Sequence, residues 1–503
     1  MSFSSIHFLL FFPIVTALYF GIPYQYRWLL LLSASCYFYM VFVPAYIFIL
    51  GFTIIIDFVA GILIERAQGK RRKWLLLVSL VSNIGVLFTF KYFNFVNDNL
   101  NELATAIHWN YSFEGLSILL PIGLSFHTFQ AMSYTIEIYR GGAKAERHFG
   151  YFALYVMFYP QLVAGPIERP QNLLPQFYEK HDFDYRRVTD GLKLMAWGFF
   201  KKIVVADRLA VAVNLVYLAP RRYTGIPLII ATYFFALQIY CDFSGYTDIA
   251  RGAARVMGFN LMRNFDRPYF STSVAEFWTR WHISLSTWFK DYLFTPLARW
   301  HAVRRAPPGQ PRAQPFKRIV NQWVRYFDIY VVFIISGLWH GANWTFLIWG
   351  ALHGTYLVLS LATKASRTKI IKSIGLNHFP LLLRWFRVFV VFNLVTFAWI
   401  FFRARNVSDA FYVATHLFAG INFSEAFGPI LEAQLGTLRS DLLITILLIL
   451  ILESVQFVVD NGGSARSMDR KPAWARWAAY YILIAAIIFL GEYQTQQFIY
   501  FQF

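Results

Sequence analysis

The sequence predicts an all-α polytopic membrane protein. Of its 503 residues, 57% are hydrophobic and only 15% are charged, whereas soluble domains carry about 25% charged residues. A soluble chain of this length could not bury so much apolar surface, so lipid must cover part of it. The only two cysteines are Cys36 and Cys241, which excludes a disulfide framework and a thiolate metal cluster.

Long apolar stretches recur along the whole chain. A helix needs about 20 apolar residues to cross a bilayer, and shorter stretches can be re-entrant or interfacial, so we expect about 11–13 transmembrane or re-entrant helices. We expect the first stretch to be a retained span rather than a signal peptide. The stretches lie at 6–22, 28–43, 45–64, 74–92, 115–137, 150–166, 191–217, 226–241, 326–342, 344–363, 383–402, 441–459 and 474–491.

The positive charges are concentrated between these stretches. Residues 66–73 carry five Lys or Arg, 299–325 carry seven and 364–372 carry four, whereas 93–114 have none. The positive-inside rule therefore predicts 66–73, 140–148, 299–325 and 364–372 in the cytoplasm, and both 93–114 and the N-terminus outside. The basic loops are typical of topology signals and of attraction to anionic lipid. Alternatively, they are a docking surface for an acidic partner molecule. No compact basic domain is present, so we expect no nucleic-acid partner.

Two segments interrupt the membrane pattern. The polar run Asp242-Phe-Ser-Gly-Tyr-Thr-Asp248 predicts irregular backbone, which at membrane depth must be buried in protein or line a wet cavity. Ser273 and Glu276 have the spacing of a capping box, so we expect a helix from about 274 to about 290. Basic loops on both sides of 326–363 predict a hairpin of two helices with a break at 341–343.

Two histidines in apolar surroundings are the candidate catalytic residues. His340 lies in an apolar run and His282 on the helix predicted after Ser273; ionisable residues at membrane depth usually mark functional sites. A neutral imidazole can act as general base for a hydroxyl that attacks a thioester or ester. The chain has no Gly-x-Ser-x-Gly motif, which excludes the local signature of an α/β-hydrolase. We expect His353 to be structural or cavity-lining.

Four sequence neighbours of the two histidines, and Asp242 of the polar run, are candidate substrate-binding residues. Because no close-spaced ligand pair accompanies His282 and His340, we expect no metal site. The five residues are Trp339, Asn343, Trp281, Ser286 and Asp242.

At these positions the chain resembles the membrane-bound O-acyltransferase (MBOAT) family, in particular its bacterial branch that O-acetylates alginate. The resemblance covers most of the chain and rests on several matching segments. Any one segment alone would be weak evidence for the family, but together they are specific for it. They are Pro121-Ile-Gly-Leu-Ser-Phe-His-Thr-Phe-Gln130, Tyr159-Pro-Gln-Leu-Val-Ala-Gly-Pro-Ile-Glu168, Asp242 to Asp248, Asn264-Phe-Asp-Arg-Pro-Tyr269, 277–297, Gly337-Leu-Trp-His-Gly-Ala-Asn-Trp344 and the ending 498–503.

The resemblance implies a helical shell around a central funnel, with His340 as the catalytic histidine and His282 as the second active-site histidine. It further implies an inner-membrane enzyme that moves an acetyl group from a cytoplasmic donor, acetyl-CoA or an acyl carrier thioester, for O-acetylation of an extracytoplasmic, alginate-like exopolysaccharide. A periplasmic or membrane-anchored acetyltransferase would complete the transfer, and no tightly bound cofactor is expected. Two alternatives stay open: D-alanyl transfer to a cell-wall polymer, and a proton-coupled transporter without acyl transfer. The missing internal repeat speaks against the transporter.

Overall fold

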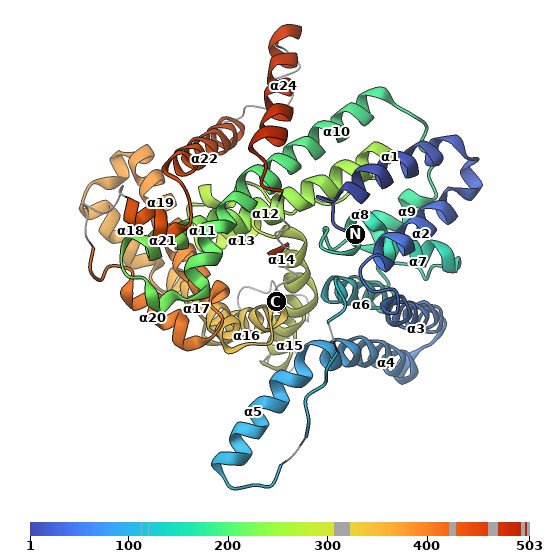
Figure 1. Ribbon diagram of the computed structural model, residues 1–503. Helices are drawn as coiled ribbons and strands as arrows, with labels where there is room; N and C mark the ends of the chain where they lie inside the picture. Colours follow the sequence, from blue (N-terminus) through green and yellow to red (C-terminus); the bar gives the residue numbers. More distant parts are fainter. Residues whose placement is uncertain are drawn as a thin grey trace. The chain divides into compact units, whose positions relative to one another are not determined.

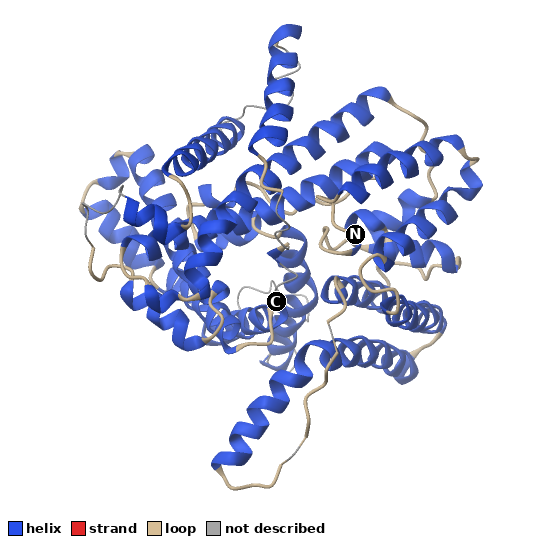
Figure 2. Cartoon of the chain, in the orientation of Figure 1, coloured by secondary structure: helices blue, strands red, loops and turns tan. Residues whose placement is uncertain are grey.

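Every regular element of the structure is helical within the residues it describes (Figure 2). The structure is a computed structural model that describes residues 1–111, 113–118, 120–305, 322–421, 429–460, 471–493 and 498–499. The chain forms two compact units, Met1–Phe199 with Gly245–Arg263, and Phe200–Ser244 with Asn264–Phe503. A single domain over 1–503, with a catalytic core at about 115–365 and peripheral helices at 1–114 and 380–503, stays a prediction.

The first unit contains the N-terminal helices (Figure 1). The π-helical segment η1 joins α4 to α5, and the C-terminal part of α12 completes the unit. Its helices are α1 (Ile6–Gly21), α2 (Tyr24–Met40), α3 (Tyr46–Arg66), α4 (Gly69–Leu87), η1 (Phe88–Tyr92), α5 (Phe93–Ala106), α6 (Leu124–Arg140), α7 (Phe149–Met157), α8 (Tyr159–Leu162), α9 (Pro170–Phe177) and α10 (Tyr185–Phe199).

The second unit contains both candidate histidines and begins with a π-helical segment, η2. Its helices are η2 (Phe200–Ala206), α11 (Asp207–Leu218), η3 (Pro220–Arg222), the N-terminal part of α12 (Ile226–Met257), η4 (Pro268–Phe270), α13 (Val274–Arg280), α14 (Ile283–Phe289), η5 (Lys290–Phe294), α15 (Thr295–Arg305), α16 (Gln322–His340), α17 (Trp344–Ala362), α18 (Lys364–Ser373), η6 (Leu376–His378), α19 (Pro380–Arg403), α20 (Val407–His416), α21 (Pro429–Leu435), α22 (Arg439–Asp460) and α24 (Ala473–Leu490).

Seven helices among the described residues are long and apolar enough to cross a membrane, which confirms an all-α polytopic membrane protein. The longest continuous helix, Gly69–Ala106, has 38 residues and is therefore about 57 Å long. The seven are Tyr46–Arg66, Gly69–Ala106, Ile226–Met257, Trp344–Ala362, Pro380–Arg403, Arg439–Phe457 and Ala473–Leu490. The funnel and the count of about 11–13 segments stay predictions.

A polar cluster ties three helices of the first unit together. Asp57 of α3 is completely buried and accepts hydrogen bonds from Ser79 Oγ (2.6 Å) and Asn83 Nδ2 (2.9 and 3.1 Å) of α4. Ser79 Oγ also contacts Thr135 Oγ1 of α6 at 3.0 Å. Polar side chains at membrane depth are tolerated when they satisfy one another in this way, so the cluster fixes the packing of α3, α4 and α6.

Three predicted boundaries were wrong. The stretch predicted at 115–137 becomes helical only at Leu124, because Gly123 adopts a φ of +78°. The stretch at 150–166 is interrupted at Phe158, since Pro160 cannot donate the backbone bond that would continue a helix. Residues 242–248 are not irregular: they lie within α12, which runs on to Met257.

Candidate functional site

A tight helical hairpin places His340. Glycines allow α16 and α17 to approach closely: a Cβ on Gly337 would lie 2.2 Å from the carbonyl oxygen of Phe346, and one on Gly350 would lie 2.3 Å from that of Phe333. Helix α16 ends at His340, and Asn343 caps α17 by accepting a hydrogen bond from the Thr345 amide. The predicted hairpin with a break at 341–343 is thus confirmed.

His340 is buried in an aromatic environment. Its ring centroid lies 4.9 Å from that of Trp339, 5.0 Å from that of Trp349 and 5.2 Å from that of Phe402. Trp339 also lies 6.2 Å from the ring of His282, so this one tryptophan contacts both histidines. Both histidines are at most 3% exposed, which excludes bulk water from the imidazoles.

His282 sits at a break between two helices. The Ser273 side chain caps α13 as predicted, but α13 ends at Arg280 and α14 starts at Ile283, so one helix to about 290 was wrong. His282 has a left-handed backbone with φ +41° and ψ +55°, a conformation that is strained for a residue other than glycine and is frequent at functional sites. Burial lowers the pKa of the His282 imidazole to about 3.

Asn264 holds this break in place. Its carbonyl oxygen accepts a hydrogen bond from the Ile283 amide at 2.9 Å, and its Oδ1 accepts one from the Ser284 amide at 3.3 Å. These amides belong to the first turn of α14, whose donors have no partner within the helix. Asn264 therefore satisfies the backbone that follows His282 and supports its strained conformation.

Asp242 belongs to a buried ionic cluster. Lys202 Nζ lies 2.7 Å from Asp207 Oδ1 and 2.8 Å from Asp242 Oδ1. The second oxygen of Asp242 accepts a hydrogen bond from the Ile499 amide at 2.8 Å. Phe243, the next residue, contacts both His282 (4.7 Å between centroids) and Phe498 (5.9 Å). The cluster thus anchors the segment 498–499 beside the neighbours of His282.

The other predicted residues make contacts within the protein. Ser286 Oγ donates to the carbonyl oxygen of Trp281 at 3.0 Å. Asn343 Nδ2 donates to the carbonyl oxygen of Arg405 at 3.0 Å. Trp281 is buried against Phe265, Phe277 and Trp399. A substrate-binding role for Trp339, Asn343, Trp281, Ser286 and Asp242 stays a prediction.

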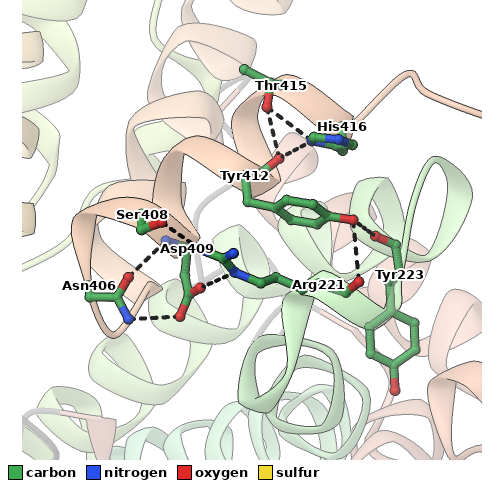
Figure 3. Close-up of polar contacts among 8 residues, drawn as sticks. All are labelled: Arg221, Tyr223, Asn406, Ser408, Asp409, Tyr412, Thr415 and His416. Atoms are coloured by element: carbon green, nitrogen blue, oxygen red, sulfur yellow. Dashed lines mark hydrogen bonds and ion pairs between the residues drawn. The ribbon is translucent and has the colours of Figure 1, made fainter.

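Helix α20 is fixed beside the turn between α11 and α12 by polar contacts (Figure 3). Arg221 Nε lies 3.3 Å from Asp409 Oδ1, and Arg221 Nη2 donates to Ser408 Oγ at 2.5 Å. The Tyr412 hydroxyl donates to the carbonyl oxygens of Arg221 and Tyr223 at 3.4 and 3.3 Å. Because Arg405 leads directly into α20 and contacts Asn343, these bonds also fix the end of the hairpin.

Sequence reasoning overlooked Lys202. The sequence did contain a signal, because Lys202 lies in the apolar stretch predicted at 191–217. Charged residues rarely occur unpaired at membrane depth, so this lysine could have predicted a buried acidic partner. Over the ranges that the structure describes, no three His, Cys, Asp or Glu side chains gather to hold a metal ion. The expectation of no metal site stays a prediction.

Together, the helices and the site define a multi-pass membrane protein with two buried histidines joined through one tryptophan in one helical unit. Residues 146–306 match the membrane-bound O-acyltransferase (MBOAT) family. The chain is 37% identical over 446 residues to the probable alginate O-acetylase AlgI of Pseudomonas aeruginosa, covering 87% of this chain and 79% of that protein.

Two further relatives differ in what their names say they modify. The chain is 33% identical to the peptidoglycan O-acetyltransferase of Helicobacter pylori, over 76% of this chain and 72% of that protein. It is 28% identical to the teichoic acid D-alanyltransferase of Streptococcus thermophilus, over 57% of this chain and 69% of that protein. The chain belongs to the MBOAT family and is an O-acyltransferase.

Proposed function

We propose that this protein moves an acetyl group from a cytoplasmic thioester donor, acetyl-CoA or an acyl carrier protein, for the O-acetylation of an extracytoplasmic polysaccharide. The single observation that carries the proposal is His340, which is buried at the end of α16 and is joined to His282 through Trp339. The two acetyl-transferring relatives support acetyl as the group transferred.

His340 acts as the general base in this proposal. Its imidazole accepts the proton of an acceptor hydroxyl while the oxygen forms a bond to the thioester carbonyl carbon. The carbon–sulfur bond then breaks, and the departing thiolate takes the proton from the imidazolium. His282 positions His340, the thioester or the acceptor, because its strained backbone and surrounding contacts fix its ring.

The distribution of charge supports an orientation in the plasma membrane. The basic segment 364–372 connects α17 to α19, so the positive-inside rule places this connection in the cytoplasm. The opposite ends of α17 and α19, where Asn343 contacts Arg405, then face the exterior. In this orientation His340 lies near the exterior face, and the N-terminus is extracytoplasmic.

A partner completes the reaction in our proposal. The chain is a membrane protein with long membrane-crossing helices, and we infer that a periplasmic or membrane-anchored acetyltransferase hands the acetyl group to the polymer. The basic loops 299–325 and 364–372 provide the side that a phosphorylated donor would approach. Of the first loop, residues 306–321 lie outside the described residues.

The test measures the O-acetyl content of the extracellular polysaccharide in cells. The strains are the wild type, a deletion, and the deletion complemented with wild type, His340→Ala or the exposed control His378→Ala. We expect acetyl to disappear on deletion and to return with wild type and His378→Ala but not with His340→Ala, at equal membrane levels. Unchanged acetyl content in the deletion would refute the proposal, and D-alanyl esters would then be measured.

A further inference from the structure

One buried carboxylate of the first unit has no cation beside it. Asp57 lies near the middle of α3 and is 0% exposed. Its oxygens accept hydrogen bonds from Ser79 and Asn83 of α4. In the part of the chain that the structure describes, no Lys, Arg or His side chain forms an ion pair with this carboxylate. The hydrogen bonds therefore leave one negative charge uncompensated at membrane depth.

The cations of the surrounding helices lie at the helix ends. Arg66 ends α3 and Arg140 ends α6, whereas residues 70–73 begin α4 and Lys91 follows its last turn. Along α3, Arg66 is nine residues beyond Asp57, which is a rise of about 13 Å. A buried charge in a protein is normally paired or bound to a metal ion, so a bound ion is the partner that this carboxylate can still have.

The hydroxyl protons around Asp57 are too few for the contacts that the hydroxyls make. Ser79 Oγ lies 2.6 Å from Asp57 Oδ1 and 3.0 Å from Thr135 Oγ1. Thr135 Oγ1 also lies 3.2 Å from the carbonyl oxygen of Met132. Each hydroxyl carries one proton, so two protons serve three close oxygen pairs. One pair is left without a positive centre between its oxygens.

The amide of Asn83 supplies an independent observation. Its Nδ2 donates to Asp57 and, at 3.0 Å, to the carbonyl oxygen of Ser79. Its Oδ1 is buried and has no hydrogen-bond partner among the described residues, and the residue is 0% exposed. A half-turn of the amide would bring Oδ1 to the carboxylate, and a cation between the two oxygens would stabilise that orientation. Asn83 can therefore add one more oxygen ligand.

We propose that Asp57, Ser79, Asn83 and Thr135 bind one sodium ion, and we call these residues the Asp57 site. All the side-chain ligands are oxygens, which hard cations prefer. The single carboxylate balances a charge of +1, whereas calcium takes about 6–8 oxygen ligands and magnesium keeps several waters. Neighbouring oxygens that lie only 2.6 and 3.0 Å apart enclose a small ion better than potassium. The ion compensates the carboxylate and holds α3, α4 and α6 together.

The Asp57 site is independent of the proposed function. It belongs to the first unit, whereas both candidate histidines belong to the second. Sodium takes no part in acyl transfer, so its binding and its effect on stability are measured without a thioester or a polysaccharide. A failure of polysaccharide acetylation in cells would leave the Asp57 site untouched, and a failure of sodium binding would leave the proposed function untouched.

The first test measures the binding of radioactive sodium to the purified full-length protein in lipid nanodiscs. We expect one ion per molecule, displaced by sodium chloride but not by choline chloride. Thr135→Val keeps the shape of the side chain but removes one oxygen, and should weaken binding by roughly five- to tenfold. Asp57→Asn should abolish binding. Asp98→Asn, which changes an exposed acid of α5 in the same unit, is the matched control and should bind sodium like the wild type.

The second test measures the unfolding temperature at constant ionic strength. Sodium chloride in place of choline chloride should raise that of the wild type by roughly 5 °C at saturation. Asp57→Asn should be as stable in choline chloride as the wild type is in sodium chloride, and should not respond to sodium. An equal response of Asp57→Asn would reveal a general salt effect, and no response of the wild type would show that a proton neutralises Asp57. Either result would overturn the proposal, as would potassium acting as well as sodium.

Discussion

The buried cluster of Lys202, Asp207 and Asp242 makes a sharp prediction about stability. One ammonium group lies within 2.8 Å of two carboxylates, and all three residues are at most 6% exposed. The cluster therefore has a net charge of about −1 if all groups are ionised. Lys202→Met removes the only cation and leaves two carboxylates facing each other in a buried site.

The expected cost follows from the loss of one partner of a buried ion pair. Such losses destabilise proteins by about 3–5 kcal/mol, which lowers the ratio of folded to unfolded protein by roughly 10²- to 10⁴-fold. Asp207→Asn leaves one cation and one anion, so it should cost less than Lys202→Met. The triple variant Lys202→Met, Asp207→Asn and Asp242→Asn removes every charge and should recover most of the loss.

The assay uses a fluorescent fusion of each variant, extracted in mild detergent. Monodisperse yield and the midpoint of thermal unfolding are expected to rank as wild type first, Asp207→Asn next, and Lys202→Met last, with the triple variant well above Lys202→Met. The reasoning fails if Lys202→Met behaves like the wild type. It also fails if the triple variant is as unstable as Lys202→Met, because packing rather than charge would then dominate.

Three further predictions follow from other parts of the molecule. Burial raises the pKa of Glu168 to about 7, so ionisation of its carboxyl group destabilises the fold as the pH rises from about 4.5 to 7. In Glu168→Gln the unfolding temperature should therefore depend less on pH over this window. An unchanged dependence of the unfolding temperature on pH would contradict the prediction. His282→Asn should keep the fold, since Asn tolerates a left-handed backbone, but it should lose thioester cleavage. His282→Val should fail to fold. Equal yields of folded protein from the two variants would refute the role of backbone strain. Gly337→Leu should abolish folded protein, because its Cβ would lie 2.2 Å from the Phe346 carbonyl oxygen. Gly85→Ala should be tolerated, because a Cβ at this position meets nothing within 4 Å. The yield of monodisperse protein is measured for both variants.

The hairpin and the capped start of α13 could be predicted because their signals are local. Basic residues on both sides of 326–363 and the break at 341–343 are visible in the sequence, and the structure confirms the hairpin. Ser273 caps α13 through a bond to the Glu276 amide, three residues ahead. Helix propensity, loop charge and helix capping depend on residues close together in the chain, so they can be predicted from a single sequence.

The interior of α12 and the break at His282 depend on distant residues. Asp242 suggested irregular backbone, yet Lys202 pairs with it and the helix continues. Asn264 supports the left-handed backbone of His282. The fold brings these two residues together, and no sequence pattern near either of them predicts the contact. Sequence reasoning therefore placed the candidate histidines correctly in apolar surroundings but could not predict which remote groups hold them.

The continuous helix from Gly69 to Ala106 gives the molecule a built-in marker of sidedness. Its 38 residues exceed the about 20 residues that cross the hydrocarbon layer, so part of the helix lies outside the lipid. Because 66–73 are basic and 93–114 contain no Lys or Arg, the positive-inside rule predicts that the end carrying α5 is on the exterior side. A single cysteine placed at the exposed Ile107, after Cys36 and Cys241 are replaced, would let a membrane-impermeant reagent applied to intact cells read the orientation of the whole chain directly.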